Sequence, residues 1–369
     1  MGRGVLRALR WGLAAIAAVS LTACDIKPAA SAVKSEAKPM DECIRILGRC
    51  TSYGGSMAVD DSCSGLEFRF SGTGASVTMQ DVRLSSHASR FGIWVDGVRM
   101  DTIQLEETER QYTLAENLPQ GPHTIRLVKL TEPRFTLSNF KGLAVEGELL
   151  PRPEERARKL EFIGDSLTAG FGNLGADPNE DYTTQTQDGT QTYAAFAAEK
   201  LGADYTVRAV SGWGVAQDCD GNLFHTLPEI YEMASSFRDT ELWDFTRFQP
   251  DAVVVNLGTN DFSSGVTVER LRESVSGFTR QIREKNPQAV IVWCYGLATH
   301  NRLEDMRQAV SQAAAATTDV YFVEIPEMDV AQDGVGNLHH PSVKAHQRAG
   351  DFLAEELNRI LRLARIPGW

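Results

Sequence analysis

The stretch that decides the fold reads Glu-Phe-Ile-Gly-Asp-Ser-Leu-Thr-Ala-Gly and occupies residues 161–170. Its short apolar run ends in Gly-Asp-Ser and passes directly into residues that favour a helix start. It therefore predicts a strand, a tight turn and a helix. The hydroxyl of Ser166 then lies at the carboxyl end of a strand, the edge of an open α/β sheet where ligands bind. We take Ser166 as a candidate nucleophile.

Beyond this stretch, strand-like and helical apolar runs alternate to the end of the chain. The run at 252–255 is continuously apolar, as a buried parallel strand is, whereas 268–282 has apolar residues three and four apart. The alternation predicts a doubly wound α/β domain over residues 151–369 with a parallel sheet of about five strands. The expected strands are 160–163, 205–210, 252–257, 290–295 and 320–323, and the expected helices are 193–201, 227–237, 268–282, 303–316 and 343–363.

Residues 41–150 show short alternating runs with turn residues between them and no sustained helical period. Asp96-Gly97 indicates a hairpin, because a primed turn needs positive φ at its centre. The segment predicts an N-terminal β-sandwich or jelly roll, which could bind carbohydrate or serve as a packing partner. A Pro-rich, charged segment at 151–158 marks its end. The expected strands are 66–70, 76–79, 91–95, 110–114, 123–130 and 143–149.

The first residues have the pattern of an export signal. Three arginines precede an apolar run at 11–21 that is too short for a membrane span. The run ends in Leu-Thr-Ala-Cys, which resembles the bacterial lipoprotein box. That resemblance implies a signal peptide over 1–23 and a lipid on Cys24, which would tether the protein to a periplasmic or cell-surface membrane face. Residues 24–40, rich in Ala, Ser, Lys and Pro, predict a flexible tether.

Composition and cysteine content narrow the class further. The chain of 369 residues carries a formal net charge of −12, and an acidic surface argues against nucleic acid as a partner. Beyond Cys24 the number of cysteines is odd. Pairing of Cys63 with Cys50 or with Cys43 is open, and Cys294 is expected to be a buried apolar residue. The spacing of Cys and His supports no metal site.

A serine hydroxyl needs a base to take its proton, and acyl transfer needs donors directed at the developing oxyanion. Three further polar segments supply candidates, and each follows an expected strand. The glycines of Ser-Gly-Trp-Gly, residues 211–214, would let a backbone N–H approach a ligand closely, and Gly-Thr-Asn-Asp offers the side chain of Asn260. Asn-Leu-His-His-Pro, residues 337–341, precedes the last expected helix and is the right place for a histidine base.

Each segment alone also has an ordinary structural explanation. Gly-Asp-Ser can be a tight strand-to-helix turn, Asn260 can cap a helix, and His340 can be a solvated cap residue. The joint occurrence of the segments, in this order and at these strand ends, favours catalysis.

In that order the segments resemble the blocks of the SGNH or GDSL hydrolase superfamily. Gly-Asp-Ser-Leu matches the nucleophile block with Ser166, Gly212 and Asn260 match the oxyanion residues, and His340 in His-Pro-Ser matches the base. The resemblance implies a flavodoxin-like, three-layer α/β/α domain and an acyl-enzyme on Ser166. The N–H groups of Ser166 and Gly212 and the Asn260 amide would hold the oxyanion, and no metal or organic cofactor is expected. The chain lacks Gly-x-Ser-x-Gly, which speaks against an ordinary α/β-hydrolase.

One departure concerns the group that orients the base. The superfamily usually has an Asp two or three residues before the His, and here Leu338 and Asn337 occupy those positions. A backbone carbonyl, the side chain of Asn337, or Asp333 in the preceding loop could orient His340 instead. Its neighbour His339 is expected to face substrate or to be structural.

A β-sandwich directly before such a domain resembles carbohydrate esterase family two, over about residues 41–369. Members remove acetyl groups from plant-type polysaccharides, with a preference for the sugar 6-position, and some use a Ser–His dyad oriented by a backbone carbonyl. Family members often carry a Trp before the catalytic His, where this chain has His339. Trp213, Trp293 and Tyr295 are candidates for stacking on a sugar ring.

The sequence therefore predicts an exported, membrane-tethered serine esterase acting on O-acetylated polysaccharide of the xylan or mannan type. Two alternatives stay open. One is the same mechanism on peptidoglycan O-acetyl groups or on another carboxylester or thioester, and the other is a carbohydrate-binding protein with a decayed site. The polysaccharide, the hydroxyl position and the oligomeric state are left open, and a monomer is favoured.

Overall fold

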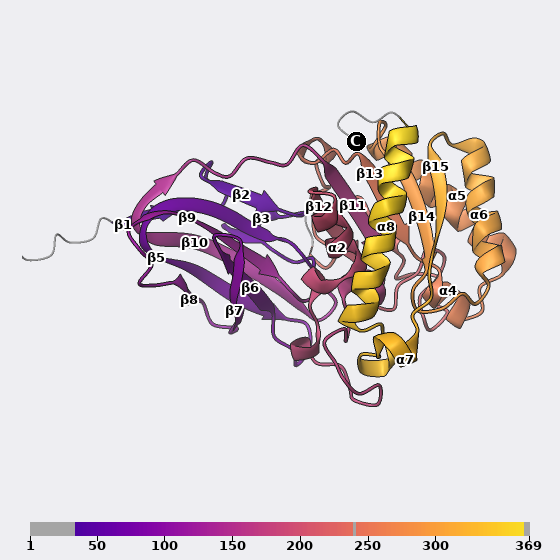
Figure 1. Ribbon diagram of the computed structural model, residues 1–369, viewed down its shortest axis with the longest axis horizontal. Coiled ribbons are helices and arrows are strands. Elements are labelled where there is room, and N and C mark those ends of the chain that lie inside the picture. The colour runs from indigo at the N-terminus through magenta and orange to yellow at the C-terminus, as the bar shows by residue number, and fades with distance from the viewer. Residues whose placement is uncertain (1–33, 239–240, 365–369) are drawn as a thin grey trace, which may run out of the picture. The chain divides into compact units, whose positions relative to one another are not determined.

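The structure is a computed structural model that describes residues 34–238 and 241–364 (Figure 1). The expected signal peptide, Cys24 and most of the expected tether lie outside these residues. An antiparallel sheet domain comes first, and a domain with a five-stranded parallel sheet follows, as the sequence predicts. Within the described ranges, none of the helices combines the length and apolar character needed to cross a membrane.

Two long strands, β5 (Gly65–Arg83) and β10 (Thr136–Leu150), organise the first domain. They pair antiparallel over most of their length. On its other side β5 pairs first with β9 and then with β8, so the sheet curves around a core that contains Phe68, Phe70 and Val77. The remaining strands are β1 (Lys34–Ala37), β2 (Ile44–Leu47), β3 (Thr51–Tyr53), β4 (Ser56–Ala58), β6 (Arg90–Val95), β7 (Val98–Gln104), β8 (Arg110–Ala115) and β9 (Gly121–Lys129).

Strand β5 corrects one expectation. Residues 71–75, Ser-Gly-Thr-Gly-Ala, suggest a turn between separate strands at 66–70 and 76–79, but the structure has one continuous strand there. Gly72 lies opposite Gly147 of β10, where a Cβ on Gly72 would come within 2.0 Å of a backbone oxygen. The glycines therefore allow close approach of two backbones rather than a turn.

The second domain has the strand order β12-β11-β13-β14-β15, all parallel, which is the flavodoxin-like order. Gly164 at the end of β11 lies opposite both Ala209 of β12 and Asn256 of β13. The strands β11, β12 and β13 therefore end at the same level, at one edge of the sheet. The strands are β11 (Lys159–Gly164), β12 (Asp204–Ala209), β13 (Ala252–Asn256), β14 (Val290–Gly296) and β15 (Val320–Ile325).

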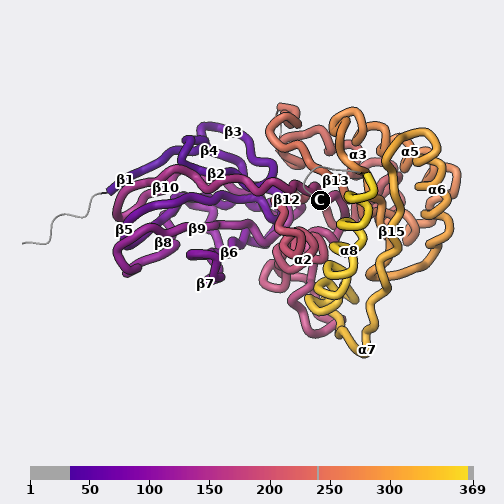
Figure 2. The backbone as a smooth tube through the Cα atoms, turned by 45° about the horizontal axis from the view of Figure 1, so that its top comes forward, coloured from indigo at the N-terminus to yellow at the C-terminus, as the bar shows by residue number. Residues whose placement is uncertain are grey.

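Helices cover both faces of this sheet and complete three layers (Figures 1 and 2). Helices α2 (Tyr193–Lys200) and α8 (Val343–Leu363) lie side by side on one face, over Phe162 of β11. Helices α5 (Val268–Lys285) and α6 (Leu303–Ala316) lie on the other, over Ile163. Neighbouring strand residues thus point to opposite cores. The short helices are α1 (Ser166–Ala169), α3 (Leu227–Ile230), α4 (Thr259–Ser263) and α7 (Val330–Asp333).

The helix expected over 227–237 is wrong beyond Ile230, where α3 ends. Two buried arginines compete for the carbonyl that a longer helix would use, because Arg208 donates to Met233 O at 2.7 Å and Arg49 donates to the same oxygen at 3.5 Å. Arg49 is distant in sequence, so a local apolar pattern carries no sign of it.

Three buried ion pairs join the sheet domain to the parallel-sheet domain. In each pair both side chains are at most 4% exposed. They are Arg49–Glu161 at 2.6 Å, Asp61–Arg208 at 3.3 Å and Asp60–Arg238 at 2.7 Å. Removing one partner of such a pair leaves a buried charge uncompensated, which costs about 3–5 kcal/mol.

The cysteines do not pair as the sequence allowed. Cys43, Cys50 and Cys63 are free thiols, and burial raises the pKa of Cys63 to about 12. Cys294 is fully buried in β14, in keeping with its expected apolar role.

Candidate active site

Four segments meet at the carboxyl edge of the parallel sheet. Ser166 follows β11, Gly212 follows β12, Asn260 lies in α4 after β13, and His340 lies between β15 and α8. Ser166, Gly212, Asn260 and His340 are each partly exposed, whereas β11, β12 and β13 are mostly buried. The edge therefore presents these polar groups on an apolar support.

The turn that carries Ser166 is held from both sides. The side chain of Asp165 caps α1 by accepting a hydrogen bond from the Leu167 N–H at 3.0 Å. A Cβ on Gly164 would lie 2.0 Å from the Thr168 hydroxyl oxygen, so glycine is required where the strand turns into the helix. Ser166 is the first helical residue, and its N–H is one of the donors that a helix leaves free.

His340 stands directly over the serine. Its Nε2 is 2.9 Å from Ser166 Oγ, and its Nδ1 is 3.2 Å from the carbonyl oxygens of both Asn337 and Leu338. A carbonyl oxygen can only accept a hydrogen bond, so Nδ1 must carry the proton. Nε2 then has a free lone pair that can accept the Ser166 proton.

The two orienting carbonyls come from an unusual turn. Leu338 and His339 both have left-handed backbone angles, with φ of 48° and 60°. Non-glycine residues reach this region at a cost, and the neighbouring contacts must hold them there. Asn337 is fully buried, and its backbone N–H donates to Gly172 O at 3.0 Å. The turn therefore replaces a carboxylate with two backbone carbonyls.

Of the three orienting groups that the sequence left open, the backbone carbonyl is the one found. The Asn337 amide donates to Asp177 O at 3.3 Å instead. Asp333 is bound to Arg348 and accepts a hydrogen bond from the Asp329 N–H at 2.9 Å. The side chains of Asn337 and Asp333 are therefore corrected to structural roles, while His339 is exposed beside the base.

The surroundings of His340 favour its neutral form. Partial burial lowers the pKa of His340 below its ordinary value, although the hydrogen bonds to Asn337 and Leu338 oppose the shift. Burial also raises the pKa of Asp165 to about 7, against the hydrogen bond from the Leu167 N–H. A neutral imidazole is the form that can remove a proton from a hydroxyl.

The two further oxyanion candidates lie on neighbouring loops. Gly212 has a φ of 84°, a left-handed conformation that favours glycine. The amide of Asn260 donates to Trp213 O at 2.9 Å and to Asp165 Oδ2 at 3.3 Å. The first bond fixes the amide, and the longer second bond is the one that a developing oxyanion can replace.

The aromatic candidates divide between the site and the core. Trp213 lies beside Gly212 and stacks on His225 with ring centroids 5.1 Å apart. Trp293 and Tyr295 are 0% exposed in β14, and Trp293 donates to the Thr279 hydroxyl at 3.0 Å. The expectation that these two residues stack on a sugar is therefore wrong, because both side chains point from an internal strand into the same core.

Sequence reasoning missed an aromatic column beside the base. The ring centroid of Phe171 is 4.6 Å from that of His340, and Tyr182 stacks on Phe171 at 4.1 Å. Phe135 of the sheet domain stacks on Tyr182 with ring centroids 4.8 Å apart. His87 makes an edge contact with Phe135 at a centroid distance of 5.4 Å. Phe171 directly follows the stretch 161–170 and could have been suspected, whereas the sheet-domain members carry no local signal.

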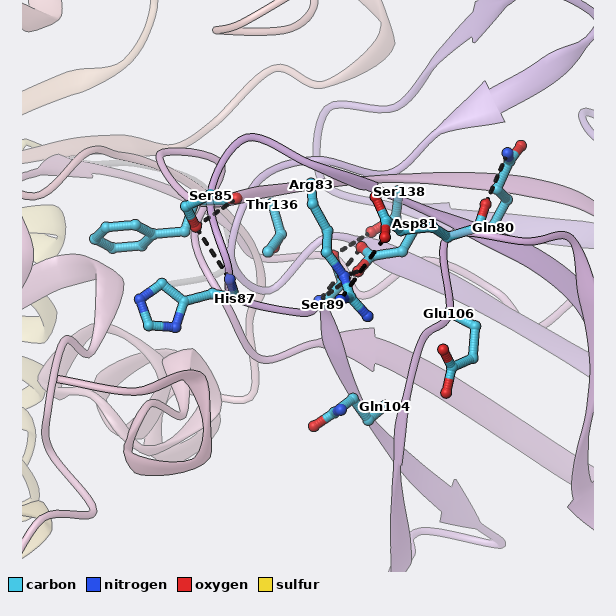
Figure 3. Close-up of polar contacts among 12 residues, drawn as sticks. Gln80, Asp81, Arg83, Ser85, His87, Ser89, Gln104, Glu106, Thr136 and Ser138 are labelled. Carbon is cyan, nitrogen blue, oxygen red and sulfur yellow. Dashed lines mark hydrogen bonds and ion pairs between the residues drawn. The ribbon is translucent and has the colours of Figure 1, made fainter.

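The sheet-domain end of this column is pinned by hydrogen bonds (Figure 3). Ser85 donates to Phe135 O at 3.3 Å and accepts from the His87 N–H at 3.2 Å. Asp81, which is 2% exposed, accepts from the Ser89 N–H at 3.2 Å. The loop that carries His87 is thus attached to the turn that carries Phe135, just before β10, and to β5.

The structure also contains a cavity of about 940 Å³ away from these groups. Its lining includes Asp204 at the start of β12 together with Arg45 and Trp94 of the sheet domain. Asp204 begins β12 and Gly212 follows the other end of that strand, so the cavity does not locate the candidate chemistry.

Comparison with known proteins agrees with this geometry. Residues 162–348 match the model of the GDSL-like lipase/acylhydrolase family, and residues 46–153 match the carbohydrate esterase 2 N-terminal domain. The structure is similar to a family two carbohydrate esterase from Clostridium thermocellum in complex with cellohexaose, with a TM-score of 0.81 and 29% identity over 86% of this chain and 99% of that one. It is also similar to an acetyl xylan esterase from Butyrivibrio proteoclasticus, with a TM-score of 0.82 and 25% identity over 89% and 99% of the two chains.

Similar proteins found by sequence comparison are also esterases. The cellulase/esterase CelE of Acetivibrio thermocellus is 31% identical over 81% of this chain, and an acetylxylan esterase/glucomannan deacetylase of Cellvibrio japonicus is 29% identical over 48% of it. The matches span only 37% and 53% of those two relatives. With more than half of its length matching one family model and the strand order and edge segments described above, the chain belongs to the GDSL-like lipase/acylhydrolase family.

Proposed function

We propose that this protein is a serine esterase that removes O-acetyl groups from polysaccharide of the xylan or mannan type. The observation that carries the proposal is the 2.9 Å contact between Ser166 Oγ and His340 Nε2, with Nδ1 held by two carbonyls. This contact also argues against a carbohydrate-binding protein with a decayed site, because a binding surface needs no base beside a serine.

In the proposed acylation, Ser166 Oγ attacks the acetyl carbonyl carbon while His340 Nε2 takes its proton. The carbonyl oxygen becomes an oxyanion, which accepts hydrogen bonds from the N–H groups of Ser166 and Gly212 and from the Asn260 amide. The C–O bond to the sugar then breaks, and the sugar oxygen takes the proton from His340. Each preorganised donor contributes about 10²–10³ in turnover.

Water completes the cycle. His340 removes a proton from water, the resulting hydroxyl attacks the acetyl group on Ser166, and acetate leaves as the Ser166 oxygen regains its proton. During both steps the imidazolium is stabilised by the two carbonyls rather than by an anion. This dyad chemistry follows from the residues present and calls on no other group.

The substrate class rests on the relatives. The similar proteins are described as an acetyl xylan esterase, an acetylxylan esterase/glucomannan deacetylase and a family two carbohydrate esterase in complex with cellohexaose. Preference for the sugar 6-position remains part of the proposal. Trp213, beside Gly212 and 9% exposed, is the candidate that keeps a place near the reacting atoms.

The test is acetate release from acetylated xylan, acetylated glucomannan and O-acetylated peptidoglycan at equal ester concentration. We expect higher kcat/KM on the two plant polysaccharides. Higher kcat/KM on peptidoglycan would instead assign the same mechanism to the cell wall, and the absence of acetate from all three would contradict the proposed activity.

The pH dependence follows from the pKa of His340. Burial lowers that pKa, and the base works only when neutral, so kcat/KM should stay high as pH falls below about 6.5, the ordinary histidine midpoint. Initial rates of acetyl ester hydrolysis from pH 4 upward would measure the acid limb, which is the fall of kcat/KM at low pH. In Asp165→Asn, which removes a neighbouring carboxyl whose pKa burial raises to about 7, the limb should persist. Loss of the limb in that variant would assign it to Asp165.

We also propose that the protein is an exported lipoprotein, anchored through Cys24 to a periplasmic or cell-surface membrane face, and a monomer. The full chain expressed in a Gram-negative host should incorporate labelled palmitate and partition into detergent. Cys24→Ser should lose both properties, whereas Cys219→Ser should keep them. Palmitate on the Cys24→Ser protein would exclude this anchor, and sedimentation of the detergent-solubilised protein would test the monomer.

A further inference from the structure

The loop between β9 and β10 crosses from the sheet domain to the residue before Gly212. Glu132 in this loop is 0% exposed. One of its carboxylate oxygens accepts a hydrogen bond from the Ser211 N–H at 2.7 Å, and the other accepts one from the Ser211 hydroxyl at 2.5 Å. The sheet domain therefore holds both the backbone and the side chain of Ser211.

Arg134, two residues further on, holds the other side of the same residue. Its guanidinium donates to Ser211 O, the carbonyl of the peptide bond that contributes the Gly212 N–H. A trans peptide unit is planar, with its C=O and N–H directed opposite ways. Fixing the direction of Ser211 O therefore fixes the direction of the Gly212 N–H.

The same contact makes that N–H a stronger donor. A hydrogen bond to an amide oxygen polarises the amide and strengthens the hydrogen bond that its N–H donates. Here the donor to the oxygen is a cation, and charge-assisted hydrogen bonds are about twice as strong as neutral ones. The positive charge also lies one peptide unit from the place where the oxyanion would form.

Glycine at position 212 is what lets the guanidinium come this close. A Cβ on Gly212 would lie 2.5 Å from Arg134 Nη1. Burial raises the pKa of Glu132, while the hydrogen bonds from Ser211 and the charge of Arg134 oppose the rise. The loop is thus fitted to this one peptide unit.

The loop is attached to the nucleophile helix as well. The Gln187 amide donates to Ala169 O of α1 at 3.0 Å, and Gln187 Oε1 accepts from the Glu132 N–H at 3.4 Å. The nucleophile helix, the oxyanion loop and the sheet-domain loop therefore share one set of hydrogen bonds.

We propose that Glu132 and Arg134 of the sheet domain are positioning residues that orient and polarise the Gly212 N–H for the oxyanion. The inference rests on the proposed esterase function, in which Gly212 is a donor. The sheet domain would then take part in catalysis, whether or not it also binds carbohydrate.

The experiment compares Arg134→Ala with Arg110→Ala, a matched exposed arginine on β8, in the full chain. We expect Arg134→Ala to lower kcat on 4-nitrophenyl acetate by about 10–10²-fold and to leave KM unchanged. Loss of a whole oxyanion donor lowers kcat by about 10²–10³-fold, and Arg134→Ala should weaken one donor without removing it. Affinity for methylboronic acid, whose serine adduct is tetrahedral, should fall by a similar factor. Added guanidinium should restore part of the rate, and Arg110→Ala should match the wild type in every measurement.

Glu132→Gln provides a second variant that keeps the shape of the side chain. It should lower kcat without raising KM, and its effect should not add to that of Arg134→Ala, because both act on one peptide unit. Unchanged kcat in Arg134→Ala would overturn the proposal. A rise in KM alone would overturn it too, since that result would make Arg134 a substrate contact.

The outcomes separate this inference from the proposed function. If the wild type is active, Ser166→Ala is inactive and Arg134→Ala behaves like Arg110→Ala, the positioning role fails and the esterase stands. If the wild type neither hydrolyses the ester nor forms an adduct on Ser166 with a serine-directed phosphonate, the proposed function itself fails.

Discussion

Ser166→Ala should lower kcat for acetyl ester hydrolysis by about 10⁶-fold, the loss seen when a serine nucleophile is removed from a hydrolase whose other groups remain. The reason is that no acyl-enzyme can form, while the oxyanion donors stay in place. Affinity for polysaccharide should not change. Stopped-flow and overnight assays of acetate release would cover the range of rates, and calorimetric titration with the polymer would measure affinity.

Ser52→Ala, an exposed serine on β3, is the matched control and should retain full activity. The wild type should gain one adduct mass with a serine-directed phosphonate, and Ser166→Ala should gain none. Wild-type rates in Ser166→Ala would rule out the covalent mechanism.

His340→Ala should be nearly as damaging as Ser166→Ala, and the double variant should be no worse than either. Ser166 and His340 act as one unit through the 2.9 Å hydrogen bond, so removing the second gains nothing once the first is gone. The rate constants of the two single variants and the double variant would show this non-additivity.

His339→Asn is the control for the base. Asn tolerates the left-handed φ of 60° at this position, so the turn should survive the change. Near-normal kcat is expected, because His339 is exposed and the Ser166 contact belongs to its neighbour. If His339→Asn were inactive while His340→Ala kept its turnover, the base would have to be reassigned to His339.

The parallel-sheet domain could be predicted because its signals are local. The continuous apolar run of β13 and the helical spacing of α5 each lie within one element. The edge segments follow from the same pattern, since parallel strands place their carboxyl ends at one edge. This is why Ser166 and His340, 174 positions apart, could be expected to meet, and the structure brings them to hydrogen-bond distance.

What could not be predicted depends on contacts between distant segments. The early end of α3 follows from Arg49 and Arg208, and the setting of Gly212 follows from Glu132 and Arg134. None of these residues shares a periodic pattern with its partner. Which backbone carbonyls orient His340 could not be predicted either, because every residue has a carbonyl and only the turn at Leu338 and His339 directs those of Asn337 and Leu338.

The buried ion pairs between the two domains have a consequence for how the domains evolve. A genetic exchange with its breakpoint near residue 150 would separate Arg49 from Glu161 and Asp60 from Arg238, and a new neighbour would have to supply matching charges at the same places. Recombinants lacking them would fold poorly and be lost. The two domains should therefore descend together as one evolutionary unit, and their family trees should have the same branching order.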